Sequence, residues 1–93
     1  MGSTVEKTAS STSDSSVATG LHVVYWLDVE SGATGGAWSL EDGTDDSGTV
    51  KIARSIPANA RRYYDWQYRP LEFKDGIFFD IGGTNVTMTV GYS

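Results

Sequence analysis

The chain has 93 residues, no cysteine, and a net charge of −5 from seven Lys and Arg against twelve Asp and Glu. This length allows one small domain, and without thiols the chain can form neither disulfides nor thiolate metal sites. The acidic balance disfavours nucleic acid as a partner. No apolar run approaches the ~20 residues of a membrane-spanning helix, so neither a membrane segment nor a signal peptide is expected.

Residues 1–20 have a composition of their own. Ser and Thr fill ten of these positions, no residue is aromatic, and Val5 and Val17 are the only sizeable apolar side chains. So little apolar surface does not offset the conformational entropy that is lost when a segment becomes ordered. We therefore predict that residues 1–20 form an extended arm outside the folded domain, held by contacts of Val5 and Val17 with a partner.

The next part of the chain alternates apolar and polar side chains. From Leu21 to Val29, Leu, Val and Tyr side chains recur at every second position, which predicts a strand with one buried face. A Ser- and Gly-rich stretch over 31–36 ends this strand, and a short strand around 38–40 follows. The acidic stretch 41–48 has the residues of a turn, and 50–56 alternates again as a third strand.

Four further strands are expected in the rest of the chain, over residues 61–69, 71–73, 77–81 and 86–92. Tyr64, Trp66 and Tyr68 share one side of the first of these strands and are expected to face the core. The turns between the strands are too short for parallel crossovers. Residues 21–93 are therefore expected to form an all-β domain, a small antiparallel β-sandwich or barrel-like fold of six to seven short strands.

The acidic turn carries candidate metal ligands. Asp42, Asp45 and Asp46 offer the oxygen donors that calcium prefers. Their spacing does not fit a helix-loop-helix calcium loop, because Ser47 stands where that loop needs Gly and Ala53 where it needs Glu. A hairpin turn rich in Asp, Gly and Ser explains the same residues. The three aspartates are therefore weak candidates, and no metal is predicted.

Other matches to catalytic motifs lack the context that the chemistry needs. The stretch from Asp80 to Asn85 is similar to the phosphate-binding turn of actin-like sugar kinases, but eight residues follow it where that fold needs many more. We interpret this stretch as a hairpin turn. His22 is the single histidine, and no nucleophile motif accompanies it. The sequence therefore predicts no enzymatic activity and no cofactor.

Charge is distributed unevenly along the chain. Residues 21–50 carry six acids and no Lys or Arg, whereas residues 51–74 carry six cations and two acids, so the local balances are −6 and +4. Opposite patches on one small domain suit contacts between copies of the chain or docking on a charged partner. Internal pairing across adjacent strands is the alternative.

The cationic part also mixes Arg with aromatic residues, a combination that is enriched at the hot spots of protein interfaces. The same mixture can stack nucleic-acid bases, which the charge of the chain disfavours, or sugar rings. The side chains of this segment that are expected to face away from the core, or to lie beside it, are candidate partner-binding residues. They are Arg61, Arg62, Tyr63, Gln67 and Arg69.

Five features follow one another in residues 21–93. An Asp-Gly-Thr turn (42–44) leads to a Val-x-Ile strand and an Ile-Pro-Ala turn (56–58), then to a Pro-Leu-x-Phe-x-x-Gly-Ile passage (70–77) and a closing Val/Thr strand (86–92). This order resembles the small β-sandwich structural proteins of tailed-bacteriophage virions. The resemblance implies a structural, non-enzymatic role, as a capsid decoration or cement protein, a head fibre or a tail component.

We therefore expect a virion protein, assembled in the cytoplasm of a host bacterium, that stabilises the capsid lattice through its arm and its charged surface. The expected partners are the major capsid protein or other virion proteins, and further copies of the chain, with a trimer as one candidate state. One alternative is a tail or baseplate adaptor or a fibre-anchoring protein. Another is a carbohydrate-binding module that uses Trp26, Trp38 or Tyr63.

Overall fold

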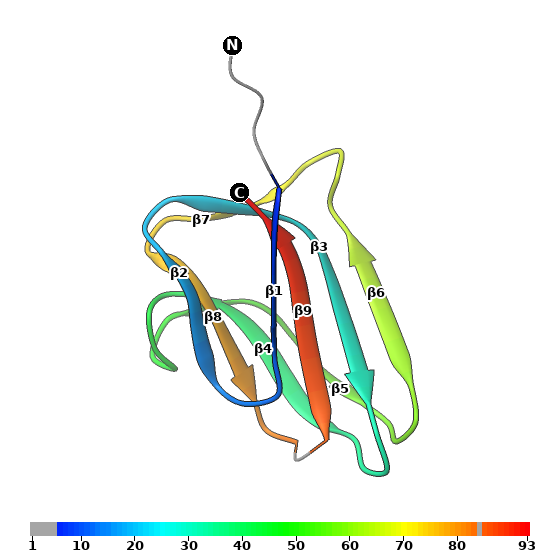
Figure 1. Cartoon of the computed structure of the whole chain (residues 1–93). Coiled ribbons are helices and arrows are strands. Elements are labelled where there is room, and N and C mark those ends of the chain that lie inside the picture. Colours follow the sequence, from blue (N-terminus) through cyan, green and yellow to red (C-terminus); the bar gives the residue numbers. More distant parts are fainter. Residues whose placement is uncertain (1–5, 84) are drawn as a thin grey trace.

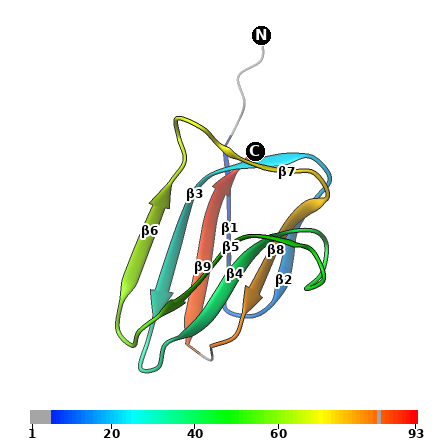
Figure 2. The same cartoon turned by 180° about the vertical axis from the view of Figure 1, so that it is seen from behind.

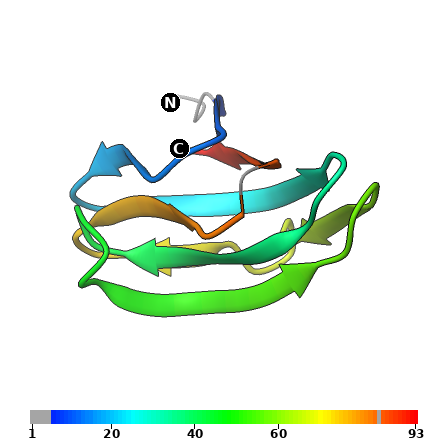
Figure 3. The ribbon, with the colours of Figure 1, turned by 90° about the horizontal axis from the view of Figure 1, so that it is seen from below.

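The computed structural model describes residues 6–83 and 85–93 (Figure 1). In this part of the chain the regular elements are nine strands: β1 (Lys7–Ser11), β2 (Ser15–Thr19), β3 (His22–Ser31), β4 (Gly36–Asp42), β5 (Thr49–Ile56), β6 (Arg61–Asp65), β7 (Leu71–Phe73), β8 (Gly76–Ile81) and β9 (Val86–Tyr92). They form two antiparallel sheets packed against each other, seen as two layers in Figure 3. The predicted all-β sandwich is confirmed, with two more strands than the upper expectation.

The strand order identifies the topology. Sheet A has the order β1-β9-β3-β6, with β7 also paired to β3, and sheet B has the order β2-β8-β4-β5 (Figure 2). Four antiparallel pairs nest around the β4–β5 turn: β4 with β5, β3 with β6, β2 with β8 and β1 with β9. These pairs alternate between the two sheets, as in a long hairpin that has been rolled up. This is the pairing scheme of a jelly roll.

The core lies between the inner faces of the two sheets. Its fully buried large side chains are Val24, Leu27, Val29, Leu40, Phe73, Ile77, Phe79, Val86, Met88 and Val90. In β9 the buried Val86, Met88 and Val90 alternate with Thr87 and Thr89, as the period of a strand with one inner face requires. Each such side chain contributes ~1.5–3 kcal/mol when it is removed from water, so the apolar alternation decides which face of each strand turns inward.

The prediction that residues 1–20 form an arm is wrong for most of this segment. Residues 7–11 form β1, paired with β9, and residues 15–19 form β2, paired with β8. Both are edge strands, so one row of main-chain hydrogen bonds and a few small apolar contacts hold them while their Ser and Thr side chains stay solvated. Val17, expected to contact a partner, instead packs against the core. Val5 lies outside the described residues.

A β-bulge changes the expected faces of β3. The register of β3 against β9 shifts between Val24 and Trp26. Val24 is therefore buried together with Leu27, whereas Leu21, which was expected on the buried face, is 81% exposed. Trp26 follows the bulge and lies on the outer side of sheet A, as the alternation with the buried Leu27 predicts.

The strand expected over 61–69 begins as expected at Arg61 but ends earlier, at Asp65. The Asp65 carboxylate accepts a hydrogen bond of 2.8 Å from the Gln67 main-chain N–H and turns the chain out of the sheet. Trp66 still packs against the core, but Tyr68 is fully exposed, so its expected place in the core is wrong.

The stretch from Asp80 to Asn85 is not a hairpin turn. It connects β8 in sheet B with β9 in sheet A, and these two strands are not paired. The Gly82 N–H donates a 2.8 Å hydrogen bond to the carbonyl of Ala37, which ties this connection to the start of β4. Within the stretch 41–48, by contrast, residues 43–48 form the expected hairpin turn between β4 and β5, and Glu41 and Asp42 end β4.

Candidate interaction surface

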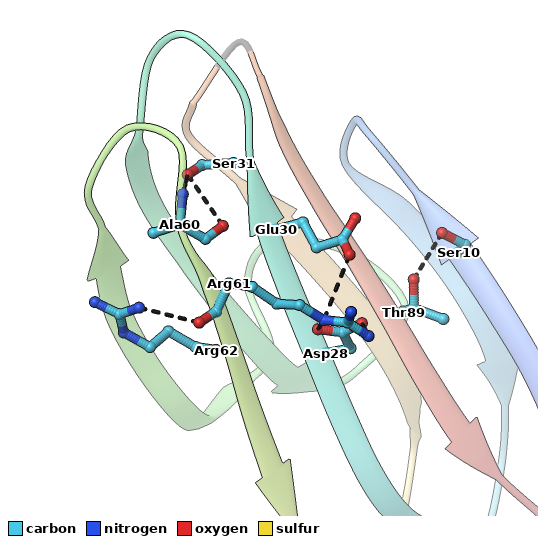
Figure 4. A network of polar contacts seen from close by, with 8 residues as sticks. All are labelled: Ser10, Asp28, Glu30, Ser31, Ala60, Arg61, Arg62 and Thr89. Atoms are coloured by element: carbon cyan, nitrogen blue, oxygen red, sulfur yellow. Dashed lines mark hydrogen bonds and ion pairs between the residues drawn. The ribbon is translucent and has the colours of Figure 1, made fainter.

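The outer face of sheet A combines side chains from four strands. It consists of Thr8, Ser10, Trp26, Asp28, Glu30, Arg61, Tyr63, Thr87 and Thr89. Thr89 stands between Asp28 on β3 and Ser10 on β1, and the Ser10 and Thr89 hydroxyl oxygens are 2.8 Å apart (Figure 4). Because β9 and β1 carry only short Ser and Thr side chains here, the longer side chains of β3 and β6 stand above them.

Arg61 is held in place on this face by two carboxylates. Its Nε and Nη2 donate hydrogen bonds of 3.0 and 2.8 Å to the two oxygens of Asp28, and Glu30 lies 3.4 Å from Nε (Figure 4). The hydrogen bonds and charge of Asp28, with the charge of Glu30, raise the pKa of Arg61 above its ordinary value. The guanidinium is planar and forked, so this pairing fixes its orientation while 67% of the side chain stays exposed.

An aromatic pair lies beside this ion pair. The rings of Trp26 and Tyr63 are stacked, with centroids 6.2 Å apart and planes 24° from parallel. Gly91 makes the position of the indole possible, because a Cβ on residue 91 would lie 2.1 Å from Trp26 Nε1. That nitrogen donates a 3.3 Å hydrogen bond to Glu6. Tyr63 is 57% exposed, so the pair presents aromatic surface next to an ordered cation.

The structure divides the predicted partner-binding residues among three places. Arg61 and Tyr63 lie together on the outer face of sheet A. Arg62 points to the other side of β6, where its guanidinium donates to the Arg61 carbonyl (Figure 4). Gln67 and Arg69 are exposed in the segment after β6. The predicted segment is therefore neither one element nor one surface.

Sequence reasoning missed the contributions of the other strands to this face. Thr8 and Ser10 were assigned to an arm, and the place of Trp26 above Gly91 joins residues 65 positions apart in the sequence. The available signal was the alternation of Thr87 and Thr89 with buried residues in the last strand, which marks them as outward-facing.

Two aspartates of the acidic stretch, Asp42 and Asp45, accept hydrogen bonds from the main chain of turns. The Asp42 carboxylate accepts hydrogen bonds from the main-chain N–H groups of Lys74, Asp75 and Gly76, at 2.8–3.3 Å. Desolvation raises the pKa of Asp42, but these three donors, with the charge of Lys51, outweigh it and the pKa is lowered.

Asp45 accepts hydrogen bonds from the main-chain N–H and the hydroxyl of Ser47, which lower its pKa. Asp46 is exposed. Over residues 6–83 and 85–93 no three His, Cys, Asp or Glu side chains come together in a way that could hold a metal ion. Asp42 and Asp45 thus order the main chain of turns, and the three aspartates do not point toward a common site.

A buried carboxyl group lies on the outer side of sheet B. Glu41 is 3% exposed and accepts a 2.7 Å hydrogen bond from the Ser39 hydroxyl, while its second oxygen has no partner in the described structure. Burial raises the pKa of Glu41, against the lowering effect of the Ser39 hydrogen bond. The neighbouring Asp80 and Asp46 raise it further. Little of this carboxyl group is open to solvent.

The contacts of His22 hold together segments that are distant in the sequence. One ring nitrogen lies 3.2 Å from the carbonyl of Ser93 and the other 2.9 Å from the carbonyl of Thr19. The ring also packs edge-on against Tyr92. These contacts join the start of β3 to the end of the chain.

No protein-family model matches the chain, and no curated protein or solved structure is significantly similar to it. Among the described residues, no helix is long and apolar enough to cross a membrane. The outer face of sheet A therefore has to be interpreted from its own chemistry.

Proposed function

We propose that the chain is a structural protein of a tailed-bacteriophage virion, a capsid decoration protein that docks on the shell through the outer face of sheet A. The order of turns and strands resembles such proteins, and jelly rolls are used in viral capsid domains. A shared fold is an analogy and does not identify a function by itself.

The observation that carries the proposal is the cluster of Trp26, Tyr63 and Arg61 on one exposed face. Trp, Tyr and Arg are the residues on which interface binding energy concentrates. Here Asp28 and Gly91 hold them in one orientation before any partner arrives, which lowers the entropy cost of binding. The Ser and Thr side chains of β1 and β9 would form the polar rim of the contact.

The place of the N-terminal segment in the two sheets changes how the protein would attach to the shell. With residues 7–19 in the two sheets, they are not free to thread onto neighbouring subunits. β1 instead contributes Thr8 and Ser10 to the docking face. Attachment by the face also leaves the edges of the sheets for contacts between copies, of which a trimer is one arrangement.

The copy number of the protein in purified virions tests the proposed location. Quantitative mass spectrometry against the major shell protein should give hundreds of copies per particle, in simple ratio to the shell protein. A count near three, six or twelve would replace decoration by a tail or baseplate adaptor or a fibre-anchoring role. Absence from the particles would contradict the virion role.

Co-sedimentation with particles that lack the protein tests the docking face. Changing Trp26 and Tyr63 to Ala should reduce binding at least tenfold, because both hot-spot rings are lost. Tyr68→Ala is the matched control, since Tyr68 is an exposed tyrosine outside this face. Equal loss in both variants, or in neither, would contradict the assignment of the face.

A carbohydrate-binding module is the second candidate, and the Trp26–Tyr63 stack favours it. Aromatic rings beside hydroxyl and carboxylate groups suit stacking against sugar rings together with hydrogen bonds. Trp38 is excluded from such a site because it is 2% exposed. Quenching of tryptophan fluorescence by oligosaccharides, lost in Trp26→Ala, would support this candidate over capsid docking.

A further inference from the structure

β5 leaves one edge of sheet B open. It is paired along its length with β4, from Thr49 opposite Asp42 to Ile56 opposite Gly36, and no described strand pairs with its other edge. At eight residues it is longer than the other edge strands, β1, β2 and β6, which have five each. An open edge presents a row of N–H and C=O groups to which another extended chain can pair.

Cations that form no ion pair among the described residues surround this edge, although the charge of Lys51 also acts on Asp42. Lys51 and Arg54 are exposed on β5, and Arg62 is exposed on β6 at the neighbouring edge of sheet A. The ion pairs of the described residues involve only Arg61. The guanidinium groups of Arg54 and Arg62 reach only the carbonyls of the residues before them, at 2.8 and 3.0 Å. The positive charge here is therefore open to an external partner, although the chain as a whole is acidic.

A hollow with a volume of about 500 Å³ adjoins the beginning of β5. Its walls combine two cations, one acid and apolar side chains, namely Lys51, Arg69, Glu72, Trp66, Pro70 and Leu71. Trp66 is fixed by stacking on Tyr64, with centroids 6.1 Å apart. Lys51 Nζ lies 5.8 Å from the centre of the Phe73 ring. Such a hollow suits an acidic side chain that is flanked by apolar ones.

We propose that the β5 edge binds an extended acidic segment of another protein, which adds a fifth strand to sheet B. Main-chain hydrogen bonds to β5 would supply affinity, and pairing with Lys51, Arg54 and Arg62 would supply specificity for acidic side chains. A second copy of β5 is a poor occupant, since it would bring its own Lys51 and Arg54 against the same cations. This site lies apart from the outer face of sheet A and does not depend on the virion role.

A labelled peptide tests strand addition directly. The probe is a fluorescein-labelled octapeptide of alternating Val and Glu, titrated with the full chain and followed by fluorescence anisotropy. A peptide with Lys in place of Glu should bind at least tenfold more weakly. So should the acidic peptide with alternate main-chain nitrogens methylated, because it lacks donors for the β5 edge. Equal binding of the methylated peptide would overturn strand addition.

Matched charge reversals test the location of the site. Arg54→Glu and Lys51→Glu should each weaken binding of the acidic peptide at least fivefold, with the β-sheet circular dichroism unchanged. Lys7→Glu makes the same charge change on β1, at the opposite edge of the molecule, and should weaken binding less than twofold. Equal effects of all three would show a response to net charge alone and overturn the site.

Two further outcomes would also overturn the proposal. If an eight-nucleotide oligothymidylate binds as tightly as the acidic peptide, the edge is a general polyanion site. If neither probe binds at low salt, the cations serve only to keep other strands away from the edge, as Lys and Arg do on many edge strands.

Discussion

Asp42 shows at the scale of one residue how a carboxylate can hold two turns together. It ends β4, and its side chain accepts the N–H groups of Lys74, Asp75 and Gly76 at the turn between β7 and β8. Asp42→Ala should lower the free energy of unfolding by about 2 kcal/mol, since hydrogen bonds to a charged group contribute about 1.5–3 kcal/mol. Urea denaturation followed by tryptophan fluorescence measures this change. Asp46→Ala, exposed in the same turn, should stay within about 0.5 kcal/mol, and an equal loss in both variants would contradict the role of Asp42.

Glu41 should make stability depend on pH in the opposite direction from a salt-bridged carboxylate. Burial raises its pKa in the folded state above the value of 4.5 taken for an unperturbed Glu. Below that pH the carboxyl is protonated in both states. As the pH rises above it, the unfolded chain ionises first, and the free energy of unfolding falls until the folded state ionises too.

Glu41→Gln removes this ionisation. The variant should therefore gain stability relative to the natural chain between pH 4 and pH 7, by about 1.4 kcal/mol for each unit by which the pKa is raised. Urea denaturation at the two pH values gives the comparison. The same difference between the two proteins at both pH values would show that Glu41 does not ionise against its environment.

At the scale of elements, β1 and β2 belong to the sheets and not to an arm. Removing residues 1–20 would strip β1 from β9 and β2 from β8, and would expose the core beside Ala9, Val17 and Ala18. We expect the truncated chain to unfold at a clearly lower temperature in circular dichroism. A synthetic peptide of residues 6–20, added in excess, should restore part of the loss by binding as the missing strands. An unchanged unfolding temperature after truncation would contradict this prediction and support an arm that lies outside the folded domain.

The elements that the sequence predicted well are those whose apolar side chains alternate. The strands expected over 50–56, 77–81 and 86–92 lie within one residue of β5, β8 and β9. β1 and β2 could not be predicted in this way, because an edge strand rich in Ser and Thr is held by main-chain pairing with distant strands. The bulge in β3 also has no signal in the sequence, yet it reverses the faces of the residues before it, so that Val24 is buried.

The candidate surface is a property of the whole molecule, which limits what the sequence could predict about it. The residues that the mixture of Arg and Tyr in 61–63 singles out are exposed in the structure. That Arg61 pairs with Asp28, and that Tyr63 stacks on a tryptophan supported by Gly91, follows only from the jelly-roll pairing of β3 with β6 and β9. Likewise, the strong charge asymmetry along the chain did not predict that, among the described residues, Arg61 would form the ion pairs while Lys51, Arg54 and Arg62 form none.

The same nested pairing should set the order in which the molecule opens. β3 and β9 in sheet A, and β4 and β8 in sheet B, are hydrogen-bonded on both sides and carry most of the buried side chains. β1, β2, β5 and β6 are bonded on one side, so they can separate while the core stays intact. Hydrogen exchange measured by NMR should therefore find the slowest amides in the four inner strands, all reporting the global free energy of unfolding. Edge strands should exchange through smaller openings, at lower free energy. Amides of β1 as protected as those of β3 would show instead that the N-terminal strands open only when the whole sandwich unfolds.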